Sequence, residues 1–309
     1  MKWVTERTDL RRMTSERLDS NVTKVKKILL VVLVFNLLTA TLKALWGYRT
    51  HSISMQADGF HSFLDAASNV VGLIGVWVAS HPPDETHPYG HRKFETFGSF
   101  CISVFLFFGC FEILKNSYDR FQNAVLPEIT PASFIIMLCT VVVNLFLSRW
   151  EKQKGTLLKS EVLIADSFHT KSDVFASLSV IASLAGSWAG YPIIDPLIGV
   201  IIAVIIGKVG AHILMESSKV LTDYSRIDPK EIHVLVMKIN GVEECHAVRT
   251  RGSMSHIYVD LHIHVAPQMP MEKAHILAHE VEAEIMKKFS DVLEVVVHLE
   301  PHIPQLEND

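Results

Sequence analysis

Six apolar runs, each long enough to cross a membrane, constrain this chain more than any other feature. They cover residues 28–48, 53–80, 98–118, 132–149, 160–188 and 193–216 of 309. A helix needs about 20 mostly apolar residues to cross roughly 30 Å of hydrocarbon. With 49% hydrophobic residues and a mean hydropathy of +0.27, the composition also lies outside that of ordinary soluble proteins. The sequence therefore predicts an α-helical membrane protein with six transmembrane helices.

Basic residues outside the apolar runs predict the orientation of the chain. Residues 1–27 carry eight Lys and Arg residues, and the connection 149–161 carries four more. The opposite connections hold few, mainly Arg49, Lys115 and Arg120. Because Lys and Arg accumulate on the cytoplasmic side, and six spans return the chain to the side where it began, we expect both termini in the cytoplasm. The expected location is the cell membrane, the inner membrane where there are two.

The composition changes at about Asp223, where apolar runs shorten and charge rises. Periodicity then predicts a helix at 229–239, strands at 243–251 and 256–265, a helix at 271–289 and a strand at 292–300. This α-β-β-α-β order is typical of a small cytoplasmic α+β domain of ferredoxin-like type. The predicted domains are a cytoplasmic N-terminal segment (1–27), a six-helix transmembrane transport domain (28–222) and a cytoplasmic metal-binding domain (223–309).

One short pattern, A-D-x-F-H-x-x-x-D, occurs twice within the apolar runs. Residues 57–65 read ADGFHSFLD, and residues 165–173 read ADSFHTKSD. Positions i, i+3 and i+7 share one helix face, so each predicted span presents an Asp, a His and an Asp along one stripe. Ionisable side chains at membrane depth cost several kcal/mol unless they pair, face water or hold an ion.

Two interpretations of this repeat are open. The two spans can be joined by buried His–Asp hydrogen bonds that serve packing alone. The interpretation we favour is a tetrahedral site with two nitrogen and two oxygen ligands, suited to Zn²⁺, because packing does not require the same spacing twice. Its ligands are His61, Asp65, His169 and Asp173. Asp58 and Asp166 either orient a histidine of this site or lie on the helix face above it.

Histidines also gather outside the membrane spans. Asp84, His87 and His91 lie in the loop PPDETHPYGHRK, where Pro82 and Pro83 end the second predicted helix. Nine of the 16 histidines fall in the predicted cytoplasmic domain. In the strand at 256–265 the alternation directs His262 and His264 to one face, opposite to the apolar residues. Solvated polar faces account for part of this set, and His256, His264, His279 and His302 need no further role.

Four stretches of the chain resemble the cation diffusion facilitator family: SMQADGFHSFLD, HPYGHRKFE, ADSFHTKSD and HAVRTR. The resemblance covers about residues 25–303 and implies a homodimeric antiporter that exports Zn²⁺ or a related divalent ion from the cytoplasm in exchange for protons. It implies that the intramembrane set His61, Asp65, His169 and Asp173 is the transport site. Many bacterial members have Asp where this chain has His61, so His61 is closer to the zinc-selective branch. Residues 149–160 lack the histidine-rich loop of many eukaryotic zinc members, which favours a bacterial-type protein.

The resemblance also assigns roles outside the membrane. It implies a loop metal site at Asp84, His87 and His91, and an interlock between Lys93 and Asp223 across the dimer. It also implies a metal site in the cytoplasmic domain, formed by His246, His262, His275, His298 and Glu300. Glu300 stands where some relatives have Asp, so the resemblance leaves the exact coordination there open.

Other classes of function fit the sequence less well. The net charge of −4 gives no reason to expect nucleic acid as a partner. A membrane metalloprotease would carry H-E-x-x-H, but His279-Glu280 is followed by Ala283 where the second histidine would stand. A membrane-tethered metal sensor is the main rival, although sensing does not require ligands inside the membrane. The sequence leaves the metal open among Zn²⁺, Fe²⁺, Co²⁺, Ni²⁺ and Cd²⁺.

Overall fold

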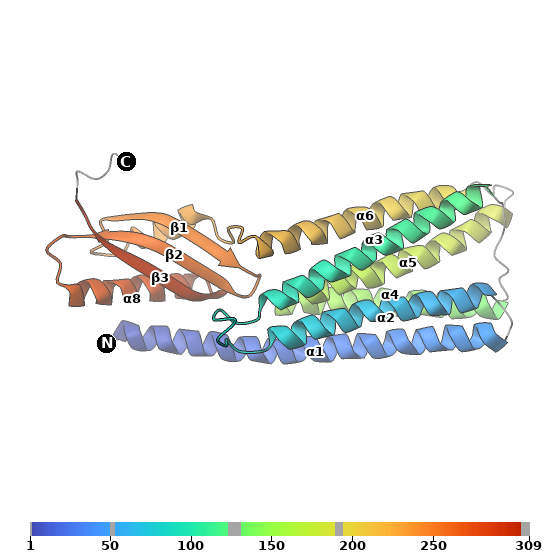
Figure 1. Cartoon of the computed structure of the whole chain (residues 1–309), viewed down its shortest axis with the longest axis horizontal. Helices are drawn as coiled ribbons and strands as arrows, with labels where there is room; N and C mark the ends of the chain where they lie inside the picture. Colours follow the sequence, from blue (N-terminus) through green and yellow to red (C-terminus); the bar gives the residue numbers. More distant parts are fainter. Residues whose placement is uncertain (1, 50–52, 123–130, 189–193, 304–309) are drawn as a thin grey trace. The chain divides into compact units, whose positions relative to one another are not determined.

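The structure is a computed structural model that describes residues 2–49, 53–122, 131–188 and 194–303 of the chain. Some helical residues, among them 53–61 and 179–188, are described by their backbone only. Six long helices come first (Figure 1): α1 (Lys2–Arg49), α2 (Ile53–Ala79), α3 (Lys93–Gln122), α4 (Pro131–Leu158), α5 (Glu161–Trp188) and α6 (Ile194–Leu221). The chain forms two compact units, one of Thr23–Ser218 and one of Met1–Val22 with Lys219–Asp309.

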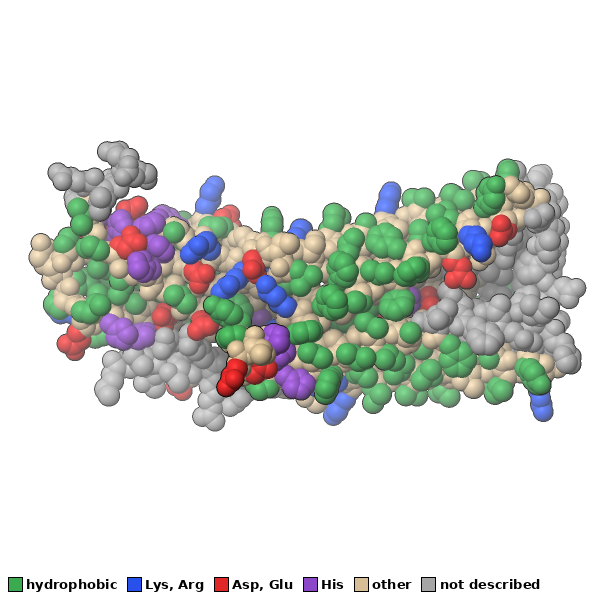
Figure 2. Space-filling model, in the orientation of Figure 1, with side chains coloured by type: hydrophobic (Ala, Val, Ile, Leu, Met, Phe, Trp, Pro, Cys, Tyr) green, Lys and Arg blue, Asp and Glu red, His purple; other side chains and the backbone are tan. Residues whose placement is uncertain are grey.

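The helices confirm the predicted helical membrane fold. Within the described residues, four are long and apolar enough to cross a membrane, at Ser20–Trp46, Lys93–Asp119, Phe134–Leu158 and Pro196–Leu221, and Asp65–Ala79 is a shorter apolar stretch. Large apolar side chains such as Phe108, Phe111 and Phe146 are about two-thirds exposed, and Figure 2 shows such side chains covering the helices. Exposed apolar area of this extent suits a lipid environment.

Helix α1 is much longer than the apolar run that predicted it. It begins at Lys2, whereas the run begins at residue 28. Hydropathy detects the stretch that can enter a membrane, but the helix continues through the polar N-terminal residues because 2–46 contain no Gly or Pro. Its inner face follows helical spacing: the buried side chains are Val25, Ile28, Leu29, Val32, Asn36, Ala40 and Lys43.

Glycines allow two pairs of helices to approach closely. A Cβ atom added to Gly75 on α2 would lie 3.0 Å from the Phe94 carbonyl oxygen and 3.2 Å from the Gly98 Cα on α3. On α6, a Cβ atom added to Gly199 would clash with the Ser117 hydroxyl of α3, whereas at Gly207 and Gly210 it would make ordinary contacts of 3.5 Å with side chains of α3. Small residues at such crossings let backbones pack without large side chains between them. Helix α3 therefore packs on α2 and α6, and α5 packs on α4, α3 and α2.

The C-terminal residues follow the predicted α-β-β-α-β order. The elements are α7 (Pro229–Val236), β1 (Glu244–Gly252), β2 (Ile257–Val265), α8 (Met271–Lys288) and β3 (Val292–Pro301). Strand β2 lies in the centre, antiparallel to β1 and parallel to β3. Its residues alternate between buried and partly exposed along the whole strand, as the period of two predicts. This confirms the predicted α+β fold.

The core of this sheet lies on one face only. Leu277, Val281 and Ile285 of α8 pack against the buried side chains of β2, of which Leu261 and Ile263 are almost fully covered. Figure 1 shows α8 along one face of the three strands. The even-numbered residues of β2 therefore point to the face that α8 does not cover.

Two local details differ from the prediction. Helix α7 ends at Val236 rather than at residue 239, because Lys238 and Ile239 donate to carbonyl oxygens three residues back, as in a tighter turn. Strand β1 contains an irregularity between His246 and Arg249, and Ala247 there has a φ of 49°. The predicted hairpin is present, with Gly252 at a φ of 122° and the Ser253 N–H donating to His256 O at 3.0 Å.

Candidate metal centres

The cluster predicted within the membrane joins α2 to α5. Asp65 of α2 and the pair His169 and Asp173 of α5 offer ligand atoms that all lie within 4.8 Å of one another. The His169 Nε2 atom is 3.6 Å from Asp65 Oδ1. His169 is 7% exposed, and neither ring nitrogen makes a hydrogen bond to the described part of the chain. A buried imidazole without a hydrogen bond, beside two carboxylates, matches the donor set that a divalent metal ion requires.

Two residues of the repeated pattern lie where side chains are not described. His61 and Asp58 fall in the part of α2 given by backbone only, so their predicted roles lie outside the described residues. The structure thus brings together three of the four predicted ligands, and the place of the fourth stays a prediction.

Asp166 belongs to a buried polar network beside this cluster. It is fully buried, and its Oδ2 accepts a hydrogen bond of 2.5 Å from Asn69 Nδ2. Asn69 Oδ1 in turn accepts from Asn36 Nδ2 at 2.7 Å, which links α5 through α2 to α1. Asp166 is not among the three grouped ligands. The described hydrogen bond joins Asp166 to Asn69 rather than to a histidine, and the choice between its two predicted roles stays a prediction.

Sequence reasoning missed several members of this network. Besides Asn36 and Asn69, the buried Glu151 of α4 accepts a hydrogen bond from Thr170 Oγ1 at 3.2 Å. The sequence contains a signal for this network, because these polar residues interrupt or closely flank apolar runs, where unpaired polar groups are costly. The repeated Asp and His pattern lies within single helices, whereas the network forms between helices.

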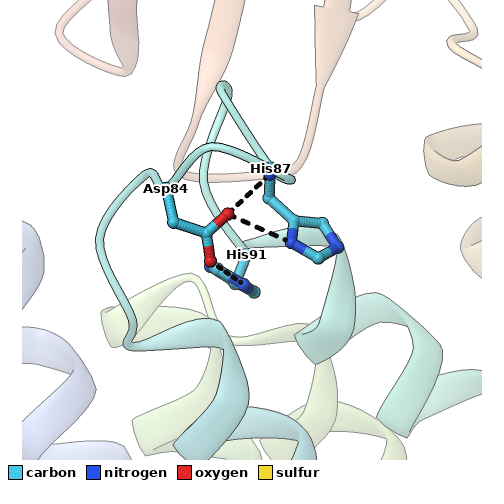
Figure 3. Close-up of side chains that lie close together, drawn as sticks. All are labelled: Asp84, His87 and His91. Carbon is cyan, nitrogen blue, oxygen red and sulfur yellow. Dashed lines mark hydrogen bonds and ion pairs between the residues drawn. The ribbon is translucent and has the colours of Figure 1, made fainter.

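The loop between α2 and α3 gathers its three predicted ligands (Figure 3). Asp84 Oδ2 lies 3.4 Å from His91 Nε2, and Asp84 Oδ1 lies 3.4 Å from His87 Nδ1. Asp84 Oδ1 also accepts hydrogen bonds from the Thr86 hydroxyl and from the backbone N–H groups of Thr86 and His87. These bonds, the Thr86 hydroxyl first, lower the pKa of Asp84 to about 2. The loop thus holds an ionised carboxylate against two imidazoles.

In the C-terminal domain, Glu300 lies at the centre of a histidine cluster, on the face of the sheet that α8 does not cover. Strand register places His246 of β1, His262 of β2 and His298 of β3 side by side. The Glu300 Oε1 atom is 2.8 Å from His262 Nδ1 and 3.4 Å from His298 Nε2. The Glu300 Oε2 atom is 3.5 Å from His246 Nε2. Burial favours the neutral acid, but hydrogen bonds from His262 and His264 lower the pKa of Glu300 overall.

The fifth predicted ligand of this domain lies elsewhere within one chain. His275 is on α8, which packs on the opposite face of the sheet, and its Nε2 is 3.1 Å from His279 Nε2. A single chain therefore does not bring His275 to Glu300. In contrast, His264 and His302, which the sequence left as solvated residues, lie near Glu300 and Glu244. Figure 2 shows histidine and acidic side chains gathered on this domain.

The predicted interlock joins residues of the two compact units. Lys93 is the first residue of α3, and Asp223 follows α6 with a φ of 56°. Both make interactions, and the pairing between them stays a prediction.

Comparison with known proteins covers nearly the whole chain. A family model described as the cation efflux transmembrane domain matches residues 29–222, and one described as the cation efflux protein cytoplasmic domain matches residues 225–302. The uncharacterized transporter MJ0449 of Methanocaldococcus jannaschii is 32% identical over 281 residues, which cover 90% of this chain and 98% of that protein.

Two further similarities are more distant. The manganese efflux system protein MneP of Bacillus subtilis is 26% identical, over 91% of this chain and 97% of its own length. Among solved structures, a cadmium form of the MamM CTD is 24% identical with a TM-score of 0.23, covering 24% of this chain and 91% of that one. Because the transmembrane family model alone matches more than half of the 309 residues, the protein belongs to the cation efflux family, the cation diffusion facilitators, which transport divalent metal cations.

Proposed function

We propose that this protein exports Zn²⁺ from the cytoplasm in exchange for protons. The observation that carries the proposal is the group of Asp65, His169 and Asp173, whose ligand atoms lie within 4.8 Å of one another between two helices of the membrane domain. His61 stands four residues before Asp65, one helical turn away, and is the proposed fourth ligand. Two imidazoles and two carboxylates form a ligand set that Zn²⁺ accepts in tetrahedral geometry.

Proton exchange follows from the chemistry of these ligands. A metal ion binds the neutral imidazole and the ionised carboxylate, so any proton held there leaves when the metal arrives. One site then holds either the metal or protons. If the site opens to each side in turn, an inward proton gradient drives metal outward without covalent chemistry, and we therefore propose a transporter rather than an enzyme.

Mn²⁺ is the second candidate substrate. The relative MneP, 26% identical over 91% of this chain, is named a manganese efflux protein. Carboxylate oxygens suit Mn²⁺, and two of the three grouped ligands are carboxylates. The imidazole of His169 and the proposed ligand His61 favour Zn²⁺, so the flux experiment compares both ions.

The remaining clusters are proposed as metal sites that support transport. Asp84, His87 and His91 form the proposed loop site, and His246, His262, His298 and Glu300 form the proposed cytoplasmic site. We propose that His275 completes the cytoplasmic site across a homodimer, because α8 carries it on the other face of its own sheet. Pairing of Lys93 with Asp223 would join the membrane and cytoplasmic parts. We also propose that both termini lie in the cytoplasm.

The test is metal flux into vesicles that contain the purified protein. Asp65→Asn and Asp173→Asn each remove a charged ligand, and each should reduce Zn²⁺ flux to the level of empty vesicles. Asp119→Asn changes an exposed carboxylate on α3, outside the cluster, and should transport normally. Normal flux in either ligand variant would refute the site. A protein that binds Zn²⁺ but gives no flux would be a sensor. Faster flux of Mn²⁺ than of Zn²⁺ would identify Mn²⁺ as the preferred substrate.

A further inference from the structure

A second group of ligand atoms lies next to the Glu300 cluster, at the end of the sheet. Glu244, His264 and His302 offer atoms that all lie within 4.8 Å of one another. Glu244 and His264 are register partners across β1 and β2. His302 follows β3, and its backbone N–H donates to Val265 O at 2.9 Å. Three different segments of the chain are thus held together by backbone hydrogen bonds.

The distances within this group are those of ligands around one ion. His264 Nδ1 lies 3.1 Å from Glu244 Oε2 and 3.4 Å from His302 Nδ1. Two ligand atoms at about 2.0–2.1 Å from a tetrahedral Zn²⁺ are roughly 3.3 Å apart. Glu243 Oε2, at 3.9 Å from His302 Nδ1, is near enough to supply a fourth oxygen after a small movement. The geometry therefore suits a tetrahedral ion with two nitrogen ligands.

The second ring nitrogen of His264 has the partner that a metal-binding histidine usually has. His264 Nε2 lies 3.1 Å from Glu300 Oε2. Histidines that bind a metal through one nitrogen generally donate the other N–H to a carboxylate or a carbonyl. With the proton on Nε2, the Nδ1 lone pair points toward Glu244 and His302. Glu300 would then serve its own cluster and orient His264 for the neighbouring one.

We propose that Glu244, His264 and His302 form an additional divalent metal site in the cytoplasmic domain, separate from the proposed ligands His246, His262 and His298. Its donor set of two imidazoles and a carboxylate selects Zn²⁺ or a similar ion such as Co²⁺. Side chains of this group are 18–39% exposed, so an ion reaches the site from solvent. This site is independent of whether the membrane domain transports Zn²⁺ or another ion.

The experiment counts metal ions bound to the full-length protein in detergent. Each variant is dialysed to equilibrium against Co²⁺ or Zn²⁺, and bound metal per chain is measured by elemental analysis. His302→Gln and Glu244→Gln should each lose one equivalent relative to wild type. The double variant should also lose one equivalent and not two, because both residues serve the same ion. The control, His233→Gln, changes a histidine whose Nδ1 faces Cys245 O, outside every ligand group, and should keep all bound metal.

Two results would overturn the proposal. One is unchanged metal content in both single variants, which would make the group a set of ion pairs. The other is a loss in the double variant that equals the sum of two single losses, which would mean two unrelated ions. Circular dichroism of each variant in EDTA, compared with wild type, separates loss of a ligand from loss of folding. If His302→Gln unfolds, Glu244→Gln and Glu244→Ala carry the test alone.

Discussion

At the scale of single residues, the choice of ligand at His61 should set metal selectivity. Zn²⁺ accepts two imidazoles with two carboxylates, whereas a third carboxylate makes the site harder and more negative. We expect His61→Asp to keep Zn²⁺ transport but to admit Cd²⁺ or Mn²⁺ better relative to Zn²⁺. Competitive flux of Zn²⁺ against Cd²⁺ at one pH and one gradient measures this change. If the ratio stays at the wild-type value while Zn²⁺ transport is intact, His61 is not a selectivity-determining ligand.

The buried amide of Asn69 should stabilise the packing of α1, α2 and α5. It donates to Asp166 and accepts from Asn36, so Asn69→Ala leaves two buried polar groups without this partner. Each such loss costs about 1–3 kcal/mol. We expect Asn69→Ala to have a lower thermal midpoint of unfolding in detergent than Asn144→Ala. Asn144 serves as the control because it is also buried, but its Oδ1 makes no hydrogen bond to the described residues. Equal midpoints for the two variants would show that the network contributes little.

At the scale of elements, a pair of glycine substitutions tests the packing of α2 on α3. Gly75→Ala places a Cβ 3.0 Å from the Phe94 carbonyl oxygen, so the helices must separate, at a cost of about 1–3 kcal/mol. At Gly109 nothing lies within 4 Å of the added Cβ. There the same change should be neutral or stabilise by about 0.5–1 kcal/mol, because alanine favours a helix. Thermal unfolding of both variants in detergent measures the difference, and stabilisation of Gly75→Ala would contradict the close contact.

At the scale of the whole molecule, metal and proton movement should be linked. In vesicles that take up Zn²⁺ through the protein, each metal ion that enters should release protons from the lumen, which becomes more alkaline. An ionophore that removes the pH gradient should abolish uphill accumulation of Zn²⁺. A dye trapped in the lumen reports pH, and the flux-deficient Asp173→Asn variant serves as the control. Zn²⁺ accumulation that does not respond to the gradient would indicate a uniporter.

Much of the architecture could be predicted from the sequence, because it depends on local periodicity. Apolar length predicted the six helices, and alternation along β2 predicted which face carries His262 and His264. The end of α2 followed from Pro82 and Pro83. Helix ends were less accurate: α1 extends to Lys2 because its polar N-terminal part carries no residue that breaks a helix.

The sequence by itself determined the elements, the face of each and the residue types able to bind metal. Only the tertiary structure decided which of those residues meet. Asp65 reaches His169 only because α2 packs on α5, and His264 joins Glu300 and Glu244 only through strand register. His275 is a histidine like His264, but it lies on α8, the helix that covers the other face of the sheet. The physical reason is that periodicity fixes where a side chain points within one element, whereas a metal site requires side chains from several elements to converge within a few ångströms.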